Sequence, residues 1–365
     1  MTHNSLPAAV KQAARENGFD LAGVAGIGEF PELEHFAEWI AEGRAGEMNY
    51  LESRNESGEF KRAALQNAAP WAKSVIVVGV NYNSDEPKSI DSPDLTRGWV
   101  SRYAWNRRDY HDVILPKLRS LESRIAAMAK DAGEEFRSWC YVDTGPLVER
   151  VYAKYAGIGW IGKNTCIINQ ELGSWLFLGV IITSLPLQPD LPAPDRCGTC
   201  TACLDACPTN AFTGPYEMDA TRCIAYLTIE KKGSFPEDLR AGIGRQVFGC
   251  DICQDVCPWN RKAPPGTEPE FAPRKELVNP ALEWLAALTP ETFRETFGKS
   301  PVKRTKLNGL RRNVVTAMGN SGRLEFVPRL RELAQDEDPA VAEHARWALD
   351  ELENSGSYDR TEEDG

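Results

Sequence analysis

The chain has no long hydrophobic run, and neither of the common glycine-rich phosphate-binding motifs occurs in its usual setting. Its longest apolar stretch, Trp175 to Ile182, is far shorter than the roughly 20 residues that a membrane helix needs. The first residues contain no secretory hydrophobic segment and no twin arginine, so we expect a cytoplasmic protein with no membrane partner. Neither G-x-G-x-x-G after a strand nor G-x-x-x-x-G-K-[ST] is present, so nicotinamide and nucleotide phosphate sites lack support.

Charge is unevenly distributed along the 365 residues. A net charge of −11 argues against indiscriminate binding to polyanions, and 42% hydrophobic content is enough for the cores of two or three globular domains. The segment from Lys299 to Arg331 nevertheless holds nine lysines and arginines against one acid, Glu325. An acidic protein therefore carries a basic segment near its C-terminal end.

Eight of the ten cysteines form two closely spaced sets. The first set reads C-x2-C-x2-C-x3-C-P and the second ends in C-x2-C-x3-C-P, which is the ligand spacing of a two-cluster bacterial ferredoxin. In such proteins the fourth cysteine of each run binds the other cluster. We therefore predict two [4Fe-4S] clusters, one on Cys197, Cys200, Cys203 and Cys257, the other on Cys207, Cys223, Cys250 and Cys253.

Zinc is the main alternative, but a four-cysteine zinc site normally uses two well separated C-x2-C pairs. Each run here is dense and is followed directly by a proline, Pro208 or Pro258, which favours a cubane cluster. Disulfides are disfavoured in a reducing compartment. Cys140 and Cys166 lie outside the pattern, and we expect both to be small buried apolar side chains.

The part before the cysteines mixes helix and strand signals, as an α/β domain does. Apolar, β-branched runs predict buried strands at Ser74–Tyr82 and Trp175–Thr183, and Lys11–Gly18 predicts a short helix. A longer helix is expected to run from near Pro116 to Gly133. Proline is tolerated in the first turn of a helix, because the N–H that it lacks would have no partner there.

The part after the cysteines is predicted to be helical. Arg312–Gly319 and Glu343–Asp350 resemble each other at a spacing of 31, which suggests repeats of the HEAT type, with an ordinary helical cap on the cysteine-rich part as the alternative. Asp338 and Pro339 predict the N-cap and first turn of one of these helices. Residues 356–365 are expected to form a disordered tail.

Five segments give the chain a specific resemblance to the epoxyqueuosine reductase family. They are RYAWNRRDYH at 102–111, VDTGPLVER at 142–150, GWIGKNT at 159–165, CIAYLT from Cys223 and FGCDIC from Phe248, and the match extends over almost the whole chain. The resemblance implies a cobalamin-dependent iron–sulfur oxidoreductase that converts epoxyqueuosine to queuosine at the wobble position of tRNA.

The resemblance also implies an α+β multidomain architecture. We expect an α/β cobalamin-binding domain related to that of reductive dehalogenases at 1–185, a ferredoxin-like two-cluster domain at 186–262, and a helical HEAT-like, tRNA-binding domain at 263–355. The proline-rich stretch Leu185–Arg196 and the sequence Ala263-Pro264-Pro265-Gly266 supply the boundaries.

Asp143 matches the family's proposed proton donor, and desolvation in an apolar pocket is expected to favour its protonated form. The expected cobalamin contacts are Asn106, Asp143, Asn164, Ile167, Leu178, Ala225 and Asp251. The sequence Asp109-Tyr-His111 lacks the glycine of the D-x-H-x-x-G motif that supplies an axial histidine. We therefore expect cobalamin bound base-off, without a protein histidine ligand.

Substrate recognition is expected to use positive charge, because the target base lies in a single-stranded anticodon loop. The expected tRNA contacts are Lys232, Lys303, Arg304, Lys306, Arg311 and Arg312. We further expect a monomer that receives electrons from an external low-potential donor such as flavodoxin or ferredoxin. Two alternatives remain: a soluble corrinoid iron–sulfur reductase of a small molecule, as in reductive dehalogenation, and a ferredoxin-type electron-transfer module.

Overall fold

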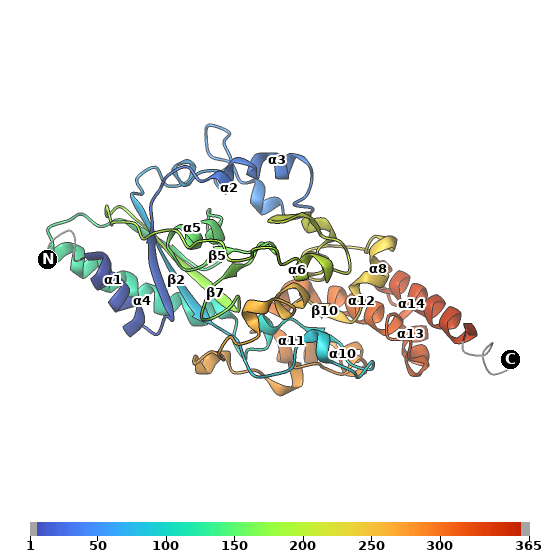
Figure 1. The fold of residues 1–365 in the computed structure, drawn as a ribbon. Helices are drawn as coiled ribbons and strands as arrows, with labels where there is room; N and C mark the ends of the chain where they lie inside the picture. Colours follow the sequence, from blue (N-terminus) through green and yellow to red (C-terminus); the bar gives the residue numbers. More distant parts are fainter. Residues whose placement is uncertain (1–5, 359–365) are drawn as a thin grey trace.

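An antiparallel four-stranded sheet forms the N-terminal half of the protein (Figure 1) in this computed structural model, which describes residues 6–358. The strand order is β1-β2-β7-β4, with bounds Leu21–Ala25, Ser74–Asn81, Leu176–Thr183 and Ser138–Tyr141. The two central strands, β2 and β7, confirm the two strands that the apolar runs predict. The sheet holds the rest of this half in place.

Strand β2 is buried on both faces of the sheet. Ile76 and Val78 lie in one hydrophobic core with the helices α1 (Leu6–Glu16) and α4 (Tyr110–Asp131), whereas Val75 and Val77 lie in a second core with α5 (Glu149–Tyr155). Alternate residues of a strand point to opposite faces, so a run of apolar residues is the pattern that a strand covered on both sides requires.

Helix α4 begins at Tyr110, earlier than the sequence predicts. Asp109 is its N-cap, and the Asp109 carboxylate accepts the His111 N–H at 3.2 Å. Pro116 lies inside the helix and cannot donate to the Asp112 carbonyl, but the Arg108 guanidinium donates to that carbonyl at 3.1 Å. The predicted start at Pro116 is wrong because a side chain replaces the missing donor.

The cysteine-rich part is built of short elements. They are α6 (Ala202–Asp205), β8 (Phe212–Gly214), β9 (Glu217–Met218), α7 (Ile224–Ile229), α8 (Glu237–Ile243), β10 (Gln246–Phe248) and α9 (Ile252–Asp255). Strand β10 pairs in parallel with β3 (Trp99–Val100), which comes from the N-terminal half. The cysteine-rich part is therefore hydrogen-bonded to a segment well before it in the sequence.

The C-terminal part consists of helices, as predicted. The bounds are α10 (Leu282–Ala286), α11 (Pro290–Phe297), α12 (Lys306–Gly319), α13 (Val327–Leu333) and α14 (Pro339–Tyr358). Their core also contains Trp99, Val100 and Trp105 from the N-terminal half. Helix α14 extends to Tyr358, into the predicted disordered tail at 356–365, and the rest of that tail lies outside the described residues. Within 6–358, no helix is long and apolar enough to span a membrane.

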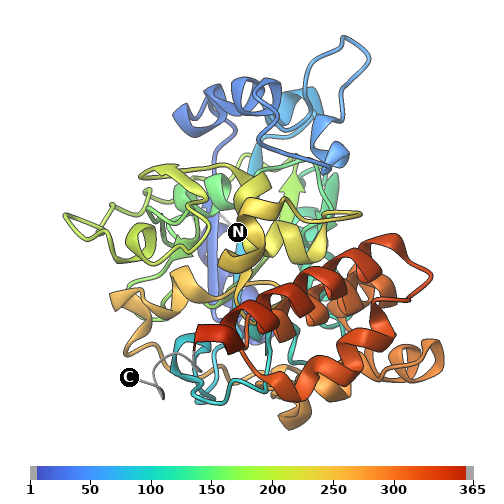
Figure 2. The ribbon, with the colours of Figure 1, turned by 90° about the vertical axis from the view of Figure 1, so that its right-hand side faces the viewer.

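Besides short 3-10 helices, two short α-helices and a two-stranded sheet remain. They are α2 (Pro31–Glu34), α3 (Phe36–Ala41), β5 (Trp160–Ile161) and β6 (Ile167–Ile168). In Figure 2 the blue segment that contains α2 and α3 lies above the yellow segment around α8, and the red C-terminal helices lie below.

The predicted N-cap of α14 is confirmed, and it generates a stability test. The Asp338 carboxylate accepts the N–H groups of Ala340 at 3.0 Å and Val341 at 3.2 Å. Losing such a cap typically costs about 1 kcal/mol. Asp338→Ala should therefore lower the thermal midpoint of unfolding while iron content stays normal. Asp338→Asn keeps a capping oxygen and should unfold close to the wild-type midpoint, and equal losses in both variants would contradict a capping role.

Candidate functional site

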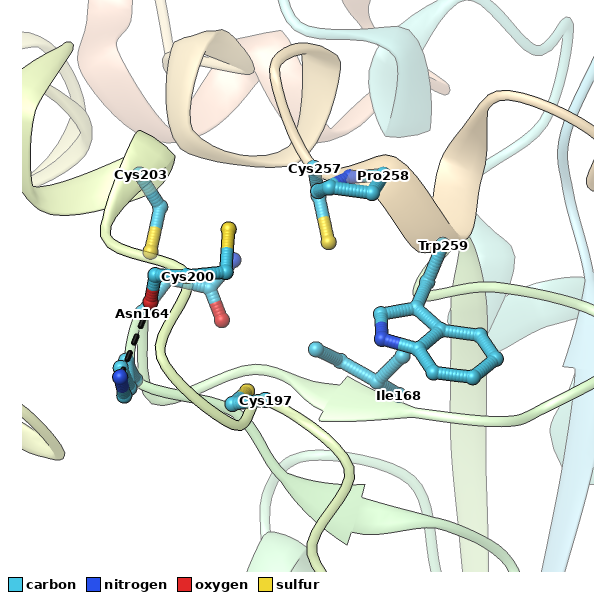
Figure 3. A pocket seen from close by; sticks show the side chains of 9 residues that line it. Asn164, Ile168, Cys197, Cys200, Cys203, Cys257, Pro258 and Trp259 are labelled. Carbon is cyan, nitrogen blue, oxygen red and sulfur yellow. Dashed lines mark hydrogen bonds between the residues drawn. The ribbon is translucent and has the colours of Figure 1, made fainter.

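Four cysteines predicted to form one ligand set line a single pocket. Cys197, Cys200, Cys203 and Cys257 surround an open space of about 350 Å³, and their side chains point into it (Figure 3). Lys163 fixes the first cysteine loop, because its ammonium donates to the carbonyls of Gly198 at 2.7 Å and Cys200 at 2.9 Å. Within residues 6–358, no group of His, Cys, Asp or Glu is arranged to hold a single metal ion.

The other four cysteines lie close enough to affect one another's ionisation. Burial, and then the neighbouring thiol of Cys223, raises the pKa of Cys250 well above its ordinary value, and Cys207 acts in the same direction. A hydrogen bond with Cys166 and burial raise the pKa of Cys253, in α9, and Cys250 and Cys223 act in the same direction. Thiols that raise one another's pKa can all lose their protons only beside a positive charge. The iron ions of a cluster supply such a charge.

Cys166 occupies a position that the spacing does not reveal. Its thiol shares a hydrogen bond with Cys253, and this contact is the main reason that the pKa of Cys166 falls to about 7. The sequence predicts a small buried apolar side chain, but the structure places Cys166 beside a predicted ligand. Cys140 packs against a hydrophobic core, and burial followed by a hydrogen bond to Glu122 raises its pKa to about 11.

Asp143 lies on the loop that follows β4. It comes two residues after Tyr141, the last residue of β4, which pairs with Val180 of β7. Its φ of 58° lies in the left-handed region, which an aspartate adopts when its surroundings impose it. The Tyr110 hydroxyl donates to the Asp143 carboxylate at 2.8 Å, and the Tyr110 ring stacks on Phe177 at 4.5 Å.

The surroundings of Asp143 correct one expectation. Its side chain is 64% exposed, so the structure does not place it in an apolar pocket. Glu149, the first residue of α5, is the more covered acid instead, with one carboxylate oxygen fully buried. Burial, and then the Asp143 charge, raises the pKa of Glu149 from 4.5 to about 7. The sequence could indicate both acids in one matched segment but could not indicate which one is covered.

An acid–histidine pair faces Asp143 from the start of α4. The Asp109 carboxylate and Nδ1 of His111 are 2.7 Å apart, which places the Nδ1 proton between them. Nε2 of His111 is buried without a hydrogen-bond partner and lies 4.0 Å from the Asp143 carboxylate. Lys303 lies 3.1 Å from Asp109. Burial opposes ionisation of Asp109, but its hydrogen bonds to His111 and Lys303 lower its pKa overall.

Tyr103 links Asp143 to the second cysteine set. Its ring lies 6.1 Å from that of Tyr110 and 6.0 Å from that of Phe248, which precedes Cys250 by two residues. Burial, and then the carboxylates of Asp143 and Asp251, raises the pKa of Tyr103. One buried ring is therefore within electrostatic reach of both the candidate acid and the candidate ligand segment.

The predicted cobalamin contacts are brought together only in part. Asn106 and Asn164 are buried, and their amides donate to the carbonyls of Tyr103 at 3.2 Å and Cys253 at 3.3 Å. The Asp251 carboxylate is engaged within the protein, because it accepts from Trp99, Ser101 and the Arg102 N–H. Its backbone remains available. Ile167 is buried in β6, and Leu178 and Ala225 are half-buried in β7 and α7.

Arg312 is not available as a tRNA contact. It is 2% exposed, and its guanidinium donates to the carbonyls of Leu227, Lys231 and Gly233, at 2.6 to 2.9 Å. Arg311 is half-buried and donates to the Leu288 carbonyl and to Asp336. Arg312 faces the cysteine-rich part, against which α12 packs, whereas the partners of Arg311 lie among the C-terminal helices. The other predicted contacts are exposed: Lys232, Lys303, Arg304 and Lys306.

Comparisons with known proteins agree with this site. Residues 196–260 match the 4Fe-4S double cluster binding domain, and residues 62–144 match the family described as Epoxyqueuosine reductase QueG, DUF1730. A Xanthomonas campestris epoxyqueuosine reductase is 40% identical over 94% of this chain and 95% of its own length.

Solved structures agree as well. An epoxyqueuosine reductase crystallised with a tRNA-Tyr epoxyqueuosine-modified stem loop is 33% identical, covers 96% of this chain and 91% of its own, and has a TM-score of 0.83. A Bacillus subtilis epoxyqueuosine reductase, with an aspartate catalytic loop swung out of the active site, is 32% identical over 96% and 91% and has a TM-score of 0.82.

The fold and the paired cysteine sets define an iron–sulfur oxidoreductase with a 4Fe-4S double cluster binding domain. The relatives match nearly the whole of this chain and of their own, and this extent identifies the family and not only the class. The chain belongs to the epoxyqueuosine reductase family.

The pocket in Figure 3 predicts how iron content responds to substitution. With two cubane clusters, the anaerobically purified protein should hold about eight irons. Cys200→Ser should lose about half of them, because it removes a thiol from one set. Cys140→Ser, outside both sets, should keep them all. Iron and sulfide assays decide the matter, and equal iron loss in the two variants would refute the ligand assignment.

The buried Glu149 predicts a pH-dependent stability. The pKa of Glu149 is about 7 in the folded protein, against an ordinary value of 4.5. Between pH 4.5 and 7 the folded protein therefore keeps a proton that the unfolded chain has lost. Wild-type stability should therefore fall, relative to Glu149→Gln, as pH rises from 4.5 to 7, by about 3 kcal/mol in all. Thermal midpoints of both proteins from pH 4.5 to 8 test this. The exposed Glu295→Gln control should follow the wild type, and a pH-independent difference for Glu149→Gln would contradict the assignment.

Proposed function

We propose that the protein reduces the epoxide of epoxyqueuosine at the tRNA wobble position to queuosine. The observation that carries the proposal is the group around Asp143, in which a carboxylate held by Tyr110 and faced by His111 lies beside the exposed cations Lys303 and Arg304. The family and the epoxyqueuosine-modified stem loop bound to a relative give the substrate class.

The residues around Asp143 fit a cobalamin. Segments that contain Asn106, Asn164 and Asp251 meet through the hydrogen bonds of Asn164 to Cys253 and of Asp251 to Ser101. Two buried polar atoms near Asp143, Nε2 of His111 and one oxygen of Glu149, have no hydrogen-bond partner among the described residues. We propose that Asn106, Asn164, Ile167, Leu178 and Ala225, with the backbone at Asp251, hold the corrin.

The axial ligand is proposed to be absent from the protein. Of the described histidines, His111 is fixed by Asp109, His344 is buried against Phe235 and Ala340, and His35 is exposed at the surface. This arrangement supports base-off binding. When bound, the cobalamin supplies a strongly nucleophilic, reducible cobalt, and the clusters supply electrons singly.

The reaction removes the epoxide oxygen as water and consumes two electrons and two protons. Asp143 is proposed to give the first proton to the oxygen as the C–O bond breaks, because an alkoxide is a poor product without an acid. Tyr110 orients the acid through its hydroxyl at 2.8 Å, and His111, held by Asp109, is positioned to return a proton to Asp143.

The tRNA is proposed to bind across the exposed cations. Lys232, Lys303, Arg304 and Lys306 are exposed, and Lys303 and Arg304 belong to the turn that contacts the Asp143 group. Phosphate contacts of this kind position a loop without reading its sequence. Arg311 and Arg312 are withdrawn from the set because they are engaged within the protein.

Several finer expectations remain proposals. They are the cobalamin domain's relation to reductive dehalogenases, the HEAT-like arrangement of α12 to α14, the monomeric state and an external low-potential electron donor. The small-molecule reductase alternative is disfavoured by the exposed cations beside Asp143. The electron-transfer module alternative leaves the Asp143 group without a task.

Asp143→Asn tests the proposed acid. The amide keeps the size of the side chain and loses the proton, and loss of a positioned general acid typically slows a reaction by ~10²–10⁴. We therefore expect single-turnover conversion of an epoxyqueuosine stem loop, followed by mass spectrometry, to slow by that factor while both cofactors stay bound.

The matched control is Asp238→Asn, which changes an exposed acid in α8 that pairs only loosely with Arg222 at 3.6 Å. It should turn over like the wild type. Wild-type turnover by Asp143→Asn with cobalamin bound would reject Asp143 as the acid and leave Glu149 as the next candidate.

A further inference from the structure

An exposed aromatic ring lies next to the candidate active site on a firmly held turn. Tyr50, in the short 3-10 helix Asn49–Glu52, is 48% exposed. The preceding Glu47 fixes this turn, since its N–H donates to the Tyr226 hydroxyl at 2.9 Å and its carboxylate binds the Lys231 ammonium at 2.6 Å. The turn is thereby tied to α7, which follows Cys223.

Arg62 ties the same turn to the Asp143 loop. One end of its guanidinium donates to the Tyr50 carbonyl at 2.7 Å and the other to the Gly145 carbonyl at 2.8 Å. Gly145 is two residues after Asp143. The Arg62 side chain thus fixes the distance between the Tyr50 backbone and the backbone of the loop that carries the candidate acid. The Arg62 guanidinium lies 5.8 Å from the centre of the Tyr50 ring.

A second arginine flanks the ring from the basic segment. Arg304 lies 5.6 Å from the centre of the Tyr50 ring and is held by Glu230, with 2.7 Å between Nε and the carboxylate. Burial, and then the carboxylate of Glu230, raises the pKa of Tyr50, and Asp143 acts in the same direction. The ring is therefore within electrostatic reach of Asp143.

This arrangement has the features of a site for a single-stranded nucleobase. Unpaired bases bind by stacking on aromatic side chains, and neighbouring cations bind their phosphates. A cation–π contact alone needs neither an exposed ring nor a guanidinium joined to the catalytic loop. The Tyr50 ring is exposed, and the Arg62 guanidinium beside it is bonded to the loop that carries Asp143. A wobble nucleotide that reaches Asp143 would place its neighbouring nucleotides near this ring.

We propose that Tyr50 is the stacking surface for an unpaired nucleobase next to the wobble nucleotide, and that Arg62 is the residue that positions it. This inference rests on the proposed function, because it assumes that an anticodon loop binds at Asp143. It adds a binding residue outside the basic segment, and it gives the segment between β1 and β2 a part in substrate recognition.

The first test is the affinity of an epoxyqueuosine-containing anticodon stem loop, measured by fluorescence anisotropy with the full-length, cofactor-loaded protein. Tyr50→Ala should bind about 5- to 150-fold more weakly, the range found when one stacking aromatic is removed. Tyr50→Phe keeps the ring and should bind like the wild type. Tyr216→Ala, a matched control that removes a tyrosine with 42% exposure elsewhere on the surface, should also bind like the wild type.

A second measurement separates stacking from a folding defect. Stem loops with an abasic nucleotide on the 5′ or the 3′ side of the wobble position are bound to wild type and to Tyr50→Ala. One abasic loop should remove most of the difference between the two proteins, because the base that stacks is gone. A difference that persists undiminished with both abasic loops would overturn the stacking role.

The two proposals fail in different ways. Wild-type protein that binds and converts the intact stem loop, together with unchanged affinity in Tyr50→Ala, would overturn the stacking surface and leave the proposed function standing. Wild-type protein that does not bind the stem loop at all would overturn both. Arg62→Lys, which keeps the charge but loses the two-ended contact, should weaken binding in the same direction as Tyr50→Ala.

Discussion

The buried carboxylate of Asp251 is the interaction on which the arrangement of the two halves depends. It accepts hydrogen bonds from Trp99, Ser101 and the Arg102 N–H, three groups within residues 99–102, a segment far away in the sequence. A buried carboxylate is costly unless donors surround it, so this contact specifies one position of the second cysteine run against the N-terminal half. The parallel pairing of β3 with β10 continues the same junction. The segment that leaves it leads directly to Asn106, Asp109 and His111.

Local patterns made much of this structure predictable. The apolar runs of β2 and β7 and the cap at Asp338 each depend on neighbours in the sequence, and each has the predicted form in the structure. The four cysteines of the first predicted set line one pocket. The start of α4 was mispredicted because a proline inside a helix is disfavoured only while its partner carbonyl lacks a donor. Arg108 provides that donor, and nothing local to Pro116 indicates it.

The site was less predictable because it depends on burial and on contacts between distant segments. Charge alone could not distinguish Arg312, which binds three carbonyls inside the protein, from Lys303, which lies beside Asp109. The same limit applies to the two acids of one matched segment, Asp143 and Glu149, of which only the second is covered. Tyr50 and Arg62 carried no motif at all. Their relation to Asp143 appears only when the chain is folded.

The pocket formed by the first cysteine set opens to the surface, and one of its members, Cys200, is exposed, whereas none of the second set is. An opening through which an electron donor can approach also admits dioxygen. Oxidative damage follows exposure and thiolate character, so a sample handled in air should decay from the outside inward. The protein would then lose its first cluster, and with it the means of accepting electrons, before the residues around Asp143 were damaged. Inactive preparations would still hold an intact Asp143 group, but electrons could no longer reach it through the first cysteine set.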